Sequence, residues 1–141
     1  MLSNKKSLLT DRQVLRCIYD MHLQSYPGPE LPNGKHENDP YVPISVRKIS
    51  AKLGCTPQLL FGRLYYHLDA KYRYKQDGGA EVHLFTPKVG GKMHCVHFPF
   101  LVATLAEHDA EHRRFAWTLW LSVVALVLSS ASVVSQVITA S

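Results

Sequence analysis

Charge is missing from the end of this 141-residue sequence. All 16 lysines and arginines and all 11 aspartates and glutamates lie at or before Arg114, and residues 115–140 also contain no glycine and no proline. The mean hydropathy of −0.09 therefore averages two unlike regions. We expect a basic soluble part followed by an uncharged tail that is long enough to span a bilayer.

Cysteine is scarce as well, since Cys17, Cys55 and Cys95 are the only three in the sequence. An odd number of widely spaced cysteines does not form a disulfide framework, so we expect reduced thiols. A signal peptide is also missing, because only Leu8 and Leu9 follow the first lysines before polar residues return. We therefore expect the soluble part to stay in the cytosol.

The uncharged tail predicts a single transmembrane helix over residues 115–140. Roughly 20 residues, at about 1.5 Å each, cross a hydrocarbon core of about 30 Å. Trp117 and Trp120 lie near the start of the tail, and Arg113 with Arg114 lies just before it. By the positive-inside rule this end faces the cytoplasm, so we expect a tail-anchored single-pass protein with its C-terminus outside. The alternative is a buried core helix, which the 114 preceding residues could hardly enclose.

Small and polar residues form one stripe along the expected span. Their spacings alternate between four and three residues: Thr118, Ser122, Ala125, Ser129, Ser132, Gln136 and Thr139. Small residues let helices approach closely in lipid, and hydroxyl and amide groups bond across the contact. The period predicts a left-handed pair or small bundle, and we expect a homodimer through this stripe, in which Gln136 finds a partner. The alternative is that serine and alanine are simply common here, because Ser130, Ala131 and Ser135 lie off the stripe.

Residues 99–114 are expected to form a juxtamembrane helix that continues into the span. This helix contains His108, Glu111 and His112 in the H-x-x-E-H spacing of some zinc proteases. We reject that function, because such a site needs a third protein ligand and a substrate cleft. The alternatives are a solvated helix, or a pH sensor in which two His108 rings face each other in a dimer.

The soluble part begins with an amphipathic helix expected over residues 8–24. Thr10 and Gln13 form a capping-box pair, and apolar residues recur at helical spacing behind them. Residues 26–43 hold five of the eight prolines together with Asn33-Gly34, so we expect a loop insertion there.

Two further helices with a tight turn between them follow a short extended piece at residues 41–44. Ser45 is positioned to cap the first helix, which Gly54 ends after Leu53. Thr56 caps the second helix, with Pro57 at its first position. The sequence ISAKLGCTPQLLFGRLYYHL resembles the helix-turn-helix pattern.

A hairpin is predicted after these helices, with strands at 72–76 and 81–86 around Asp77-Gly78-Gly79. Residues 87–92 are expected to break the chain, and residues 93–98 to form another strand. This order resembles a winged helix-turn-helix domain over residues 10–98. The fold class is then α+β: a winged helix-turn-helix domain at 1–98, followed by a long C-terminal helix that becomes a single transmembrane span.

The resemblance implies binding of double-stranded DNA, with the second helix of the motif in the major groove. Nine basic residues lie between positions 47 and 92 against three acidic ones, which gives this region +6 while the rest of the chain sums to −1. The residues expected to contact nucleic acid are Gln58, Arg63, Arg73, Lys75, Lys88, Arg47 and Lys48. The chain as a whole resembles membrane-tethered winged-helix regulators, so we expect a transcriptional regulator or a DNA tether.

The expected outer face of the second helix leaves another function open. This face holds Gln58, Phe61, Gly62, Tyr65 and Asp69, and it lacks the arginine and asparagine that usually read bases. Phe61 and Tyr65 could instead dock a protein partner, which would make the chain a membrane-anchored adaptor. A third possibility is a small membrane effector that acts through its span.

No enzyme, metal site or cofactor is predicted. His94-Cys95-Val96-His97 lies on an expected strand, where successive side chains point to opposite faces. Ser45 and Lys48 fit S-x-x-K, but the other motifs of penicillin-binding enzymes are absent from the sequence. The glycine pairs at 78–79 and 90–91 indicate hairpin turns rather than phosphate loops.

Overall fold

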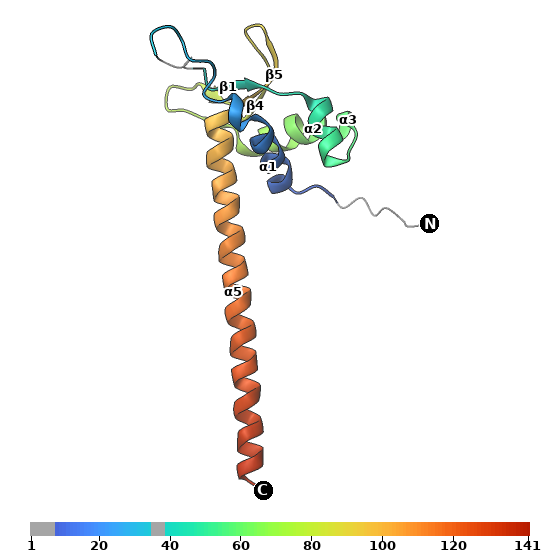
Figure 1. The fold of residues 1–141 in the computed structure, drawn as a ribbon, viewed down its shortest axis with the longest axis vertical. Coiled ribbons are helices and arrows are strands. Elements are labelled where there is room, and N and C mark those ends of the chain that lie inside the picture. The colour runs from blue at the N-terminus through green and yellow to red at the C-terminus, as the bar shows by residue number, and fades with distance from the viewer. Residues whose placement is uncertain (1–7, 35–38) are drawn as a thin grey trace, which may run out of the picture. The chain divides into compact units, whose positions relative to one another are not determined.

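The computed structural model describes residues 8–34 and 39–141 (Figure 1). Contacts within the chain divide it into a first compact unit that ends at Leu105 and a second unit, Ala106–Ser141. In chain order the elements are α1 (Asp11–His22), η1 (Leu23–Ser25), β1 (Tyr41–Pro43), α2 (Val46–Leu53), α3 (Pro57–Gly62), η2 (Arg63–Leu68), α4 (Asp69–Tyr72), β2 (Tyr74–Lys75), β3 (Glu81–Val82), β4 (Phe85–Val89), β5 (Lys92–His97) and α5 (Phe98–Thr139). Mixed helices and small antiparallel sheets, followed by a long apolar helix, confirm the coarse architecture expected from the sequence.

Helix α1 begins at the expected capping box. Thr10 Oγ1 accepts a hydrogen bond from the Gln13 backbone N–H, and the Gln13 side chain accepts one from the Thr10 N–H. The apolar face packs into the core through Val14, Leu15 and Ile18, none of which is exposed. The helix is shorter than the predicted 8–24, because the chain turns into η1 after His22.

Part of the expected loop insertion at 26–43 can be compared with the structure. Positions 35–38, like the first seven residues of the chain, lie outside the described residues. The last three residues of that range, Tyr41–Pro43, form strand β1, which confirms the short extended piece expected at residues 41–44.

Local signals also define the next two helices. Ser45 Oγ accepts from the Lys48 N–H at the start of α2, and Gly54 ends the helix at φ +70°, a conformation that favours glycine. Thr56 Oγ1 accepts from the Leu59 N–H at the start of α3, where Pro57 takes the first turn. These cap predictions are confirmed.

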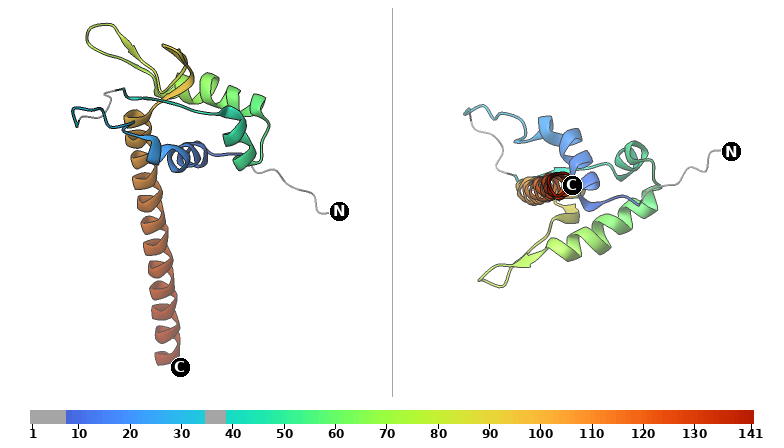
Figure 2. Two further views of the ribbon diagram at one scale, coloured as in Figure 1. Left: turned by 45° about the horizontal axis from the view of Figure 1, so that its top comes forward. Right: turned by 90° about the horizontal axis from the view of Figure 1, so that it is seen from below.

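Helix α3 continues without a break through η2 and α4, so one helical run covers residues 57–72. The middle segment, η2, is π-helical. Leu60, Leu64 and Leu68 bury one side of the run against the core. Figure 2 shows this run leading directly into the β2–β3 hairpin.

The strands differ from the prediction at two places. Residues 87–92 do not break the chain: β4 extends through Pro87 to Val89 and turns at Gly90, at φ +57°, into β5. The sheet order is β1-β5-β4, so β4 is an edge strand, where a proline that lacks an N–H is tolerated. The expected strand 81–86 is instead divided into β3 and β4, which belong to different sheets.

The core of the first unit gathers side chains from helices and sheet together. Its largest fully buried members are Phe85 from β4 and Phe98 from the start of α5. Leu101 and Leu105 are buried as well, so the first two turns of α5 belong to the first compact unit. These two turns of α5 follow directly after β5 and cover one side of the core.

Beyond Asp109, every residue of α5 and the residues that follow it are exposed. The helix is long and apolar enough to cross a membrane, and its most apolar stretch is not buried within the chain. The alternative of a core helix enclosed by the soluble part is therefore wrong. This candidate membrane-spanning helix is consistent with a single-pass membrane protein.

Candidate nucleic-acid interface

The outer side of the helical run at 57–72 is nearly uncharged. Its exposed large hydrophobic side chains are Leu59, at 66%, and Tyr66, at 78%, and Gln58 near the helix start is also exposed. A Cβ added at Gly62 would lie 3.8 Å from the Tyr66 ring, so that ring covers the glycine. Only Gln58 on this side offers the amide that pairs with adenine in DNA.

Arg63, which was expected to contact nucleic acid, is paired in the structure with Asp11 at the start of α1. Its Nη2 donates to Asp11 Oδ1 at 2.6 Å, and one helical turn further His67 Nε2 lies 3.1 Å from the same oxygen. Lys71 Nζ donates to Asp11 Oδ2 at 2.9 Å. The three basic side chains thus converge on one carboxylate at the start of α1, and Arg63 is held within the protein.

The charge network around Asp11 also sets the proton affinity of that carboxyl. Burial acts to raise the pKa of Asp11, but hydrogen bonds from Lys71 and His67 and the charges of Lys71 and Arg63 outweigh it. The pKa therefore lies below its usual value, and Asp11 stays ionised. This network fixes α1 to the helical run.

Asp69 was expected on the outer face with Phe61 and Tyr65, and that prediction is wrong. Its side chain is buried, at 6% exposure. Oδ1 accepts hydrogen bonds from the backbone N–H groups of Leu84 and Phe85 at 2.8 and 3.1 Å, while Oδ2 lies 2.9 Å from His83 Nδ1.

The π-helical segment explains why Asp69 turns inward. An α-helical projection places residues 61, 65 and 69 in one row, but π-helical hydrogen bonds fit more residues into each turn and rotate the later residues. Asp69 also explains why the expected strand 81–86 is divided. Its carboxylate accepts from the backbone N–H groups of Leu84 and Phe85, which lie where β4 begins.

Phe61 and Tyr65 contact each other, with ring centroids 4.6 Å apart. Both are half-buried, because β5 covers them: the Tyr65 hydroxyl lies 2.9 Å from His94 Nδ1. Burial raises the pKa of Tyr65 to about 12. The protein-docking alternative therefore rests less on these two rings than on Leu59 and Tyr66, whose exposure the α-helical projection did not identify.

The remaining basic residues of the 47–92 region are exposed. Their side chains form no ion pair with a carboxylate in the described part of the chain: Arg47, Lys48, Lys52, Arg73, Lys75 and Lys88. The paired ones are Arg63, Lys71 and Lys92. The sequence shows no such division, since all nine have the same formal charge.

These six cations fall into three groups on the first unit. Arg47, Lys48 and Lys52 lie on or near the exposed side of α2, Arg73 and Lys75 at the β2–β3 hairpin, and Lys88 on β4. Gln58 and Arg73 mark opposite ends of the helical run, about 20 Å apart at roughly 1.5 Å per residue. The structure thus brings Arg73 and Lys75 together and separates them from Gln58.

The histidine motifs do not assemble a metal site. His94 contacts Tyr65, whereas His97 Nδ1 accepts a hydrogen bond from the Phe100 N–H and has its pKa lowered by burial. Among the described residues no group of three or more His, Cys, Asp or Glu side chains could hold a metal ion. This includes His108, Glu111 and His112 on α5.

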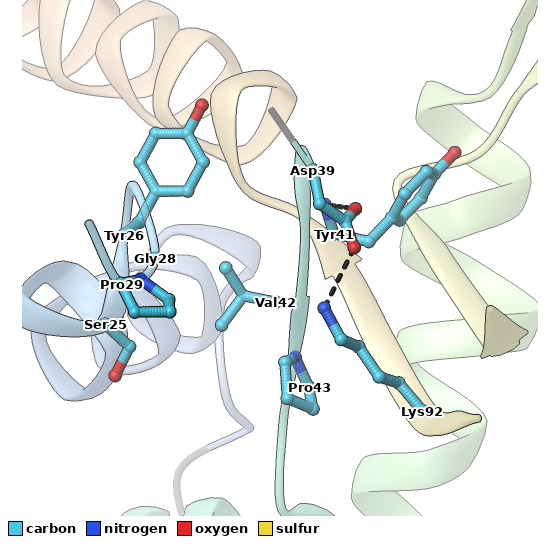
Figure 3. Close-up of a pocket in the computed structure, with 9 residues that line it drawn as sticks. All are labelled: Ser25, Tyr26, Gly28, Pro29, Asp39, Tyr41, Val42, Pro43 and Lys92. Atoms are coloured by element: carbon cyan, nitrogen blue, oxygen red, sulfur yellow. Dashed lines mark hydrogen bonds and ion pairs between the residues drawn. The ribbon is translucent and has the colours of Figure 1, made fainter. Parts of the chain in front are cut away.

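An open cavity of about 340 Å³ lies beside strand β1 (Figure 3). The two charged groups in its lining are paired: Lys92 Nζ donates to Asp39 Oδ2 at 2.8 Å, and Asp39 Oδ1 accepts from the Tyr41 N–H. The Ile44 N–H donates to the His94 carbonyl, and the Phe98 N–H donates to the Pro40 carbonyl. In this antiparallel register the backbone N–H and C=O groups of residues 40, 42 and 44 point toward β5, so the backbone groups of Tyr41 and Pro43 point away from the sheet. With Tyr41 bonded to Asp39 and Pro43 lacking an N–H, this edge is protected against strand addition.

Four of the five hydroxyl groups of the α5 stripe donate hydrogen bonds within the helix, and the Ser129 hydroxyl is the exception in the described chain. Thr118 Oγ1 donates to the Arg114 carbonyl, Ser122 Oγ to the Thr118 carbonyl and Ser132 Oγ to the Ser129 carbonyl. No such bond is present for the Gln136 carboxamide in the described chain. Gln136 is therefore the stripe member whose larger polar group, a carboxamide, has no hydrogen-bond partner among the described residues.

Similarity to known proteins does not indicate a function for this chain. Comparisons with family models, with curated proteins and with solved structures find no match to it.

Proposed function

We propose that this chain is a membrane-anchored winged helix-turn-helix protein that holds double-stranded DNA at the membrane surface, mainly by contacts to phosphates. The observation on which the proposal rests is the set of six exposed cations without a carboxylate partner. Such side chains can exchange their counterions for DNA phosphates, whereas cations already paired inside the protein cannot do so without breaking those pairs.

The order of elements supports the winged-helix part of the proposal. Helix α1, strand β1, helices α2 and α3 and the β4–β5 hairpin follow one another, and β5 lies between β1 and β4 in the sheet. In this reading the wing is the β4–β5 hairpin with Lys88, rather than the hairpin around Asp77. The β2–β3 hairpin is then an insertion that adds Arg73 and Lys75 to the basic surface.

The outer side of the helical run favours weak sequence preference. Leu59 and Tyr66 offer no charged or bidentate group to a base edge, and Arg63 is occupied by Asp11. Phosphate contacts position a protein on DNA but do not read its sequence. We therefore favour a DNA tether over a regulator that recognises one operator.

The second unit supplies the anchor. Arg113 and Arg114 precede the uncharged part of α5, so we place the first unit on the cytoplasmic side and the end of the helix on the other side. We further propose that two copies pair through the α5 stripe, because the Gln136 carboxamide would otherwise be unpaired in lipid. A dimer would present two first units to one duplex and so raise the apparent affinity.

Salt dependence of DNA binding tests the proposal. The full chain would be reconstituted in nanodiscs of phosphatidylcholine, and binding to fluorescent random-sequence duplex DNA would be measured at about 50 and about 200 mM salt. We expect binding that weakens steeply with salt, and a shallower slope for Lys88→Gln. The matched control is Lys71→Gln, which removes a cation that is paired with Asp11.

Absence of salt-sensitive binding to duplex DNA would refute the proposal. A second candidate would then apply, namely a membrane-anchored adaptor, which the exposure of Leu59 and Tyr66 on the same helical run favours. For that function, Tyr66→Ser would abolish partner binding at any salt concentration, whereas DNA tethering would lose little with the same change.

A further inference from the structure

An exposed tyrosine lies at the start of the β2–β3 hairpin, between two cations of the chain. Tyr74 is 49% exposed, and Arg73 before it and Lys75 after it are exposed as well. Neither cation forms an ion pair with a carboxylate in the described part of the chain. Glu81 is the register partner of Lys75, but its Oε2 lies 3.6 Å from His83 Nε2. The hairpin therefore combines an open aromatic ring with positive charge that no ion pair neutralises.

A row of other rings supports Tyr74 from one side. Its ring centroid lies 5.5 Å from that of Phe100, and the two ring planes stand at 90°. Phe100 in turn contacts His97 at 6.1 Å, and His97 contacts Tyr41 at 5.1 Å. His97 Nδ1 accepts from the Phe100 N–H, which ties the His97 ring to the start of α5. Tyr74 is therefore the exposed end of a row whose other members are half-buried, and its ring is positioned before any ligand binds.

We propose that Tyr74, Arg73 and Lys75 form a binding site for single-stranded DNA. Every nucleic-acid base has a π-face that stacks on an aromatic side chain, and proteins that bind single strands combine such rings with positive charge. In this site an unpaired base lies on the open part of the Tyr74 ring, while Arg73 and Lys75 contact neighbouring phosphates. A base inside a duplex is already stacked between its neighbours. The site therefore selects unpaired strands.

Charge distinguishes Tyr74 from Tyr66, the other exposed tyrosine among the described residues of the first unit. Tyr66 is 78% exposed, but Arg63 and Lys71 on the same helical run both donate to Asp11. Their positive charge is already used within the protein. Only the tyrosine of the β2–β3 hairpin therefore has the exposed cations beside it that an anionic strand requires.

This inference goes beyond the proposed tether, although Arg73 and Lys75 contribute to both. Contacts to the phosphates of a duplex need no aromatic ring, whereas base stacking needs Tyr74. Removal of the ring should therefore separate the two activities.

Binding of the full chain to a single strand tests the site. The chain in phosphatidylcholine nanodiscs would be titrated into fluorescent oligodeoxythymidylate or into the random-sequence duplex, followed by fluorescence anisotropy. Tyr74→Leu keeps an apolar side chain against Phe100 but removes the ring. We expect about tenfold weaker binding of the single strand and unchanged binding of the duplex. Tyr74→Phe keeps the ring and should match the wild type, and Tyr66→Ser, the matched control, should change neither.

Photo-cross-linking of the wild-type chain makes the test independent of the folding of the variants. An oligodeoxythymidylate that carries iodouracil would be irradiated in the complex, and the modified peptide would be identified by mass spectrometry. We expect the cross-link in the peptide that contains Tyr74. No binding of the single strand, a cross-link only elsewhere, or an equal loss for Tyr74→Phe and Tyr74→Leu would overturn the proposal. Binding of the single strand without binding of the duplex would refute the tether and leave this site standing, and the reverse result would refute this site alone.

Discussion

The two compact units satisfy their polar side chains by different routes. In the first unit, Asp69 receives hydrogen bonds from backbone groups 15 and 16 residues away, and Asp11 binds Arg63 from 52 residues away. In the second unit, Ser122 and Ser132 donate to carbonyl groups only four and three residues back. These polar residues of the first unit therefore hold distant elements together, while the hydroxyl groups of Ser122 and Ser132 are satisfied within the helix itself.

A similar contrast divides the basic residues within the first unit. Arg63, Lys71 and Lys92 stabilise contacts between elements through Asp11 and Asp39. The six exposed cations make no such contact, so their removal should leave the fold unchanged and reduce only the attraction for an anionic partner. The paired and the exposed basic residues are thus separable by mutation.

The largest effect that would sharpen the comparison is expected for Asp69→Ala. Removal of the carboxylate leaves the Leu84 and Phe85 N–H groups buried without acceptors, which should destabilise the first unit by about 3 kcal/mol. Urea unfolding of the full chain in micelles, followed by circular dichroism, measures this loss. Asp77→Ala in the exposed β2–β3 turn is the control, and an equal effect of the two changes would contradict the assigned role of Asp69.

A smaller loss of stability is expected for Asp11→Asn. The free energy of unfolding should fall by about 1 kcal/mol near neutral pH, because the charge network around Asp11 is only partly shielded from water. The pKa of Asp11 lies below its ordinary value of 3.8. Its stabilisation is therefore complete above that value and is lost as the pH falls through the lower folded-state pKa. Wild type and variant should differ in unfolding free energy at pH 7 and converge in acid.

Asp20→Asn, on the exposed side of the same helix, is the control for Asp11. It should follow the wild-type curve at every pH. A constant gap between wild type and Asp11→Asn down to strong acid would show that the carboxylate charge is not what stabilises the contact.

The smallest predicted effect is on self-association of the second unit, and it should leave the fold unchanged. Gln136→Leu removes the unpaired carboxamide of the stripe and should weaken self-association in vesicles by about 0.6 kcal/mol, while the helix stays intact. Energy transfer between labelled chains measures the association, with Val137→Leu off the stripe as the control. Stronger association of Gln136→Leu than of the control would contradict pairing through this face.

The sequence predicted well those features that depend on neighbouring residues. The capping box at Thr10, the caps at Ser45 and Thr56, the stop at Gly54 and the apolar helix after Arg114 each involve residues within about one turn. Such signals can be recognised without knowledge of the fold. They place most helices correctly.

Features that depend on distant contacts could not be predicted in the same way. The π-helical turn rotates Asp69 into the core, and from there it divides the strand at 81–86. The Arg63–Asp11 pair joins residues that nothing in the local sequence connects. The sequence does contain one signal for the buried position of Asp69, namely an aspartate on an otherwise apolar helix face with a histidine in the short strand that follows. This signal does not identify the backbone N–H groups that Asp69 binds.

The measurement that tests the DNA proposal most directly compares two double variants of equal charge. Lys75→Gln with Lys88→Gln removes two exposed cations, whereas Lys71→Gln with Lys92→Gln removes two that are paired with carboxylates. Binding of the reconstituted full chain to duplex DNA would be followed across a salt series. The exposed pair should reduce the slope of log affinity against log salt by about 1.8, and the paired one should leave it unchanged. Equal slopes for the two variants, or no binding by the wild type, would contradict the account.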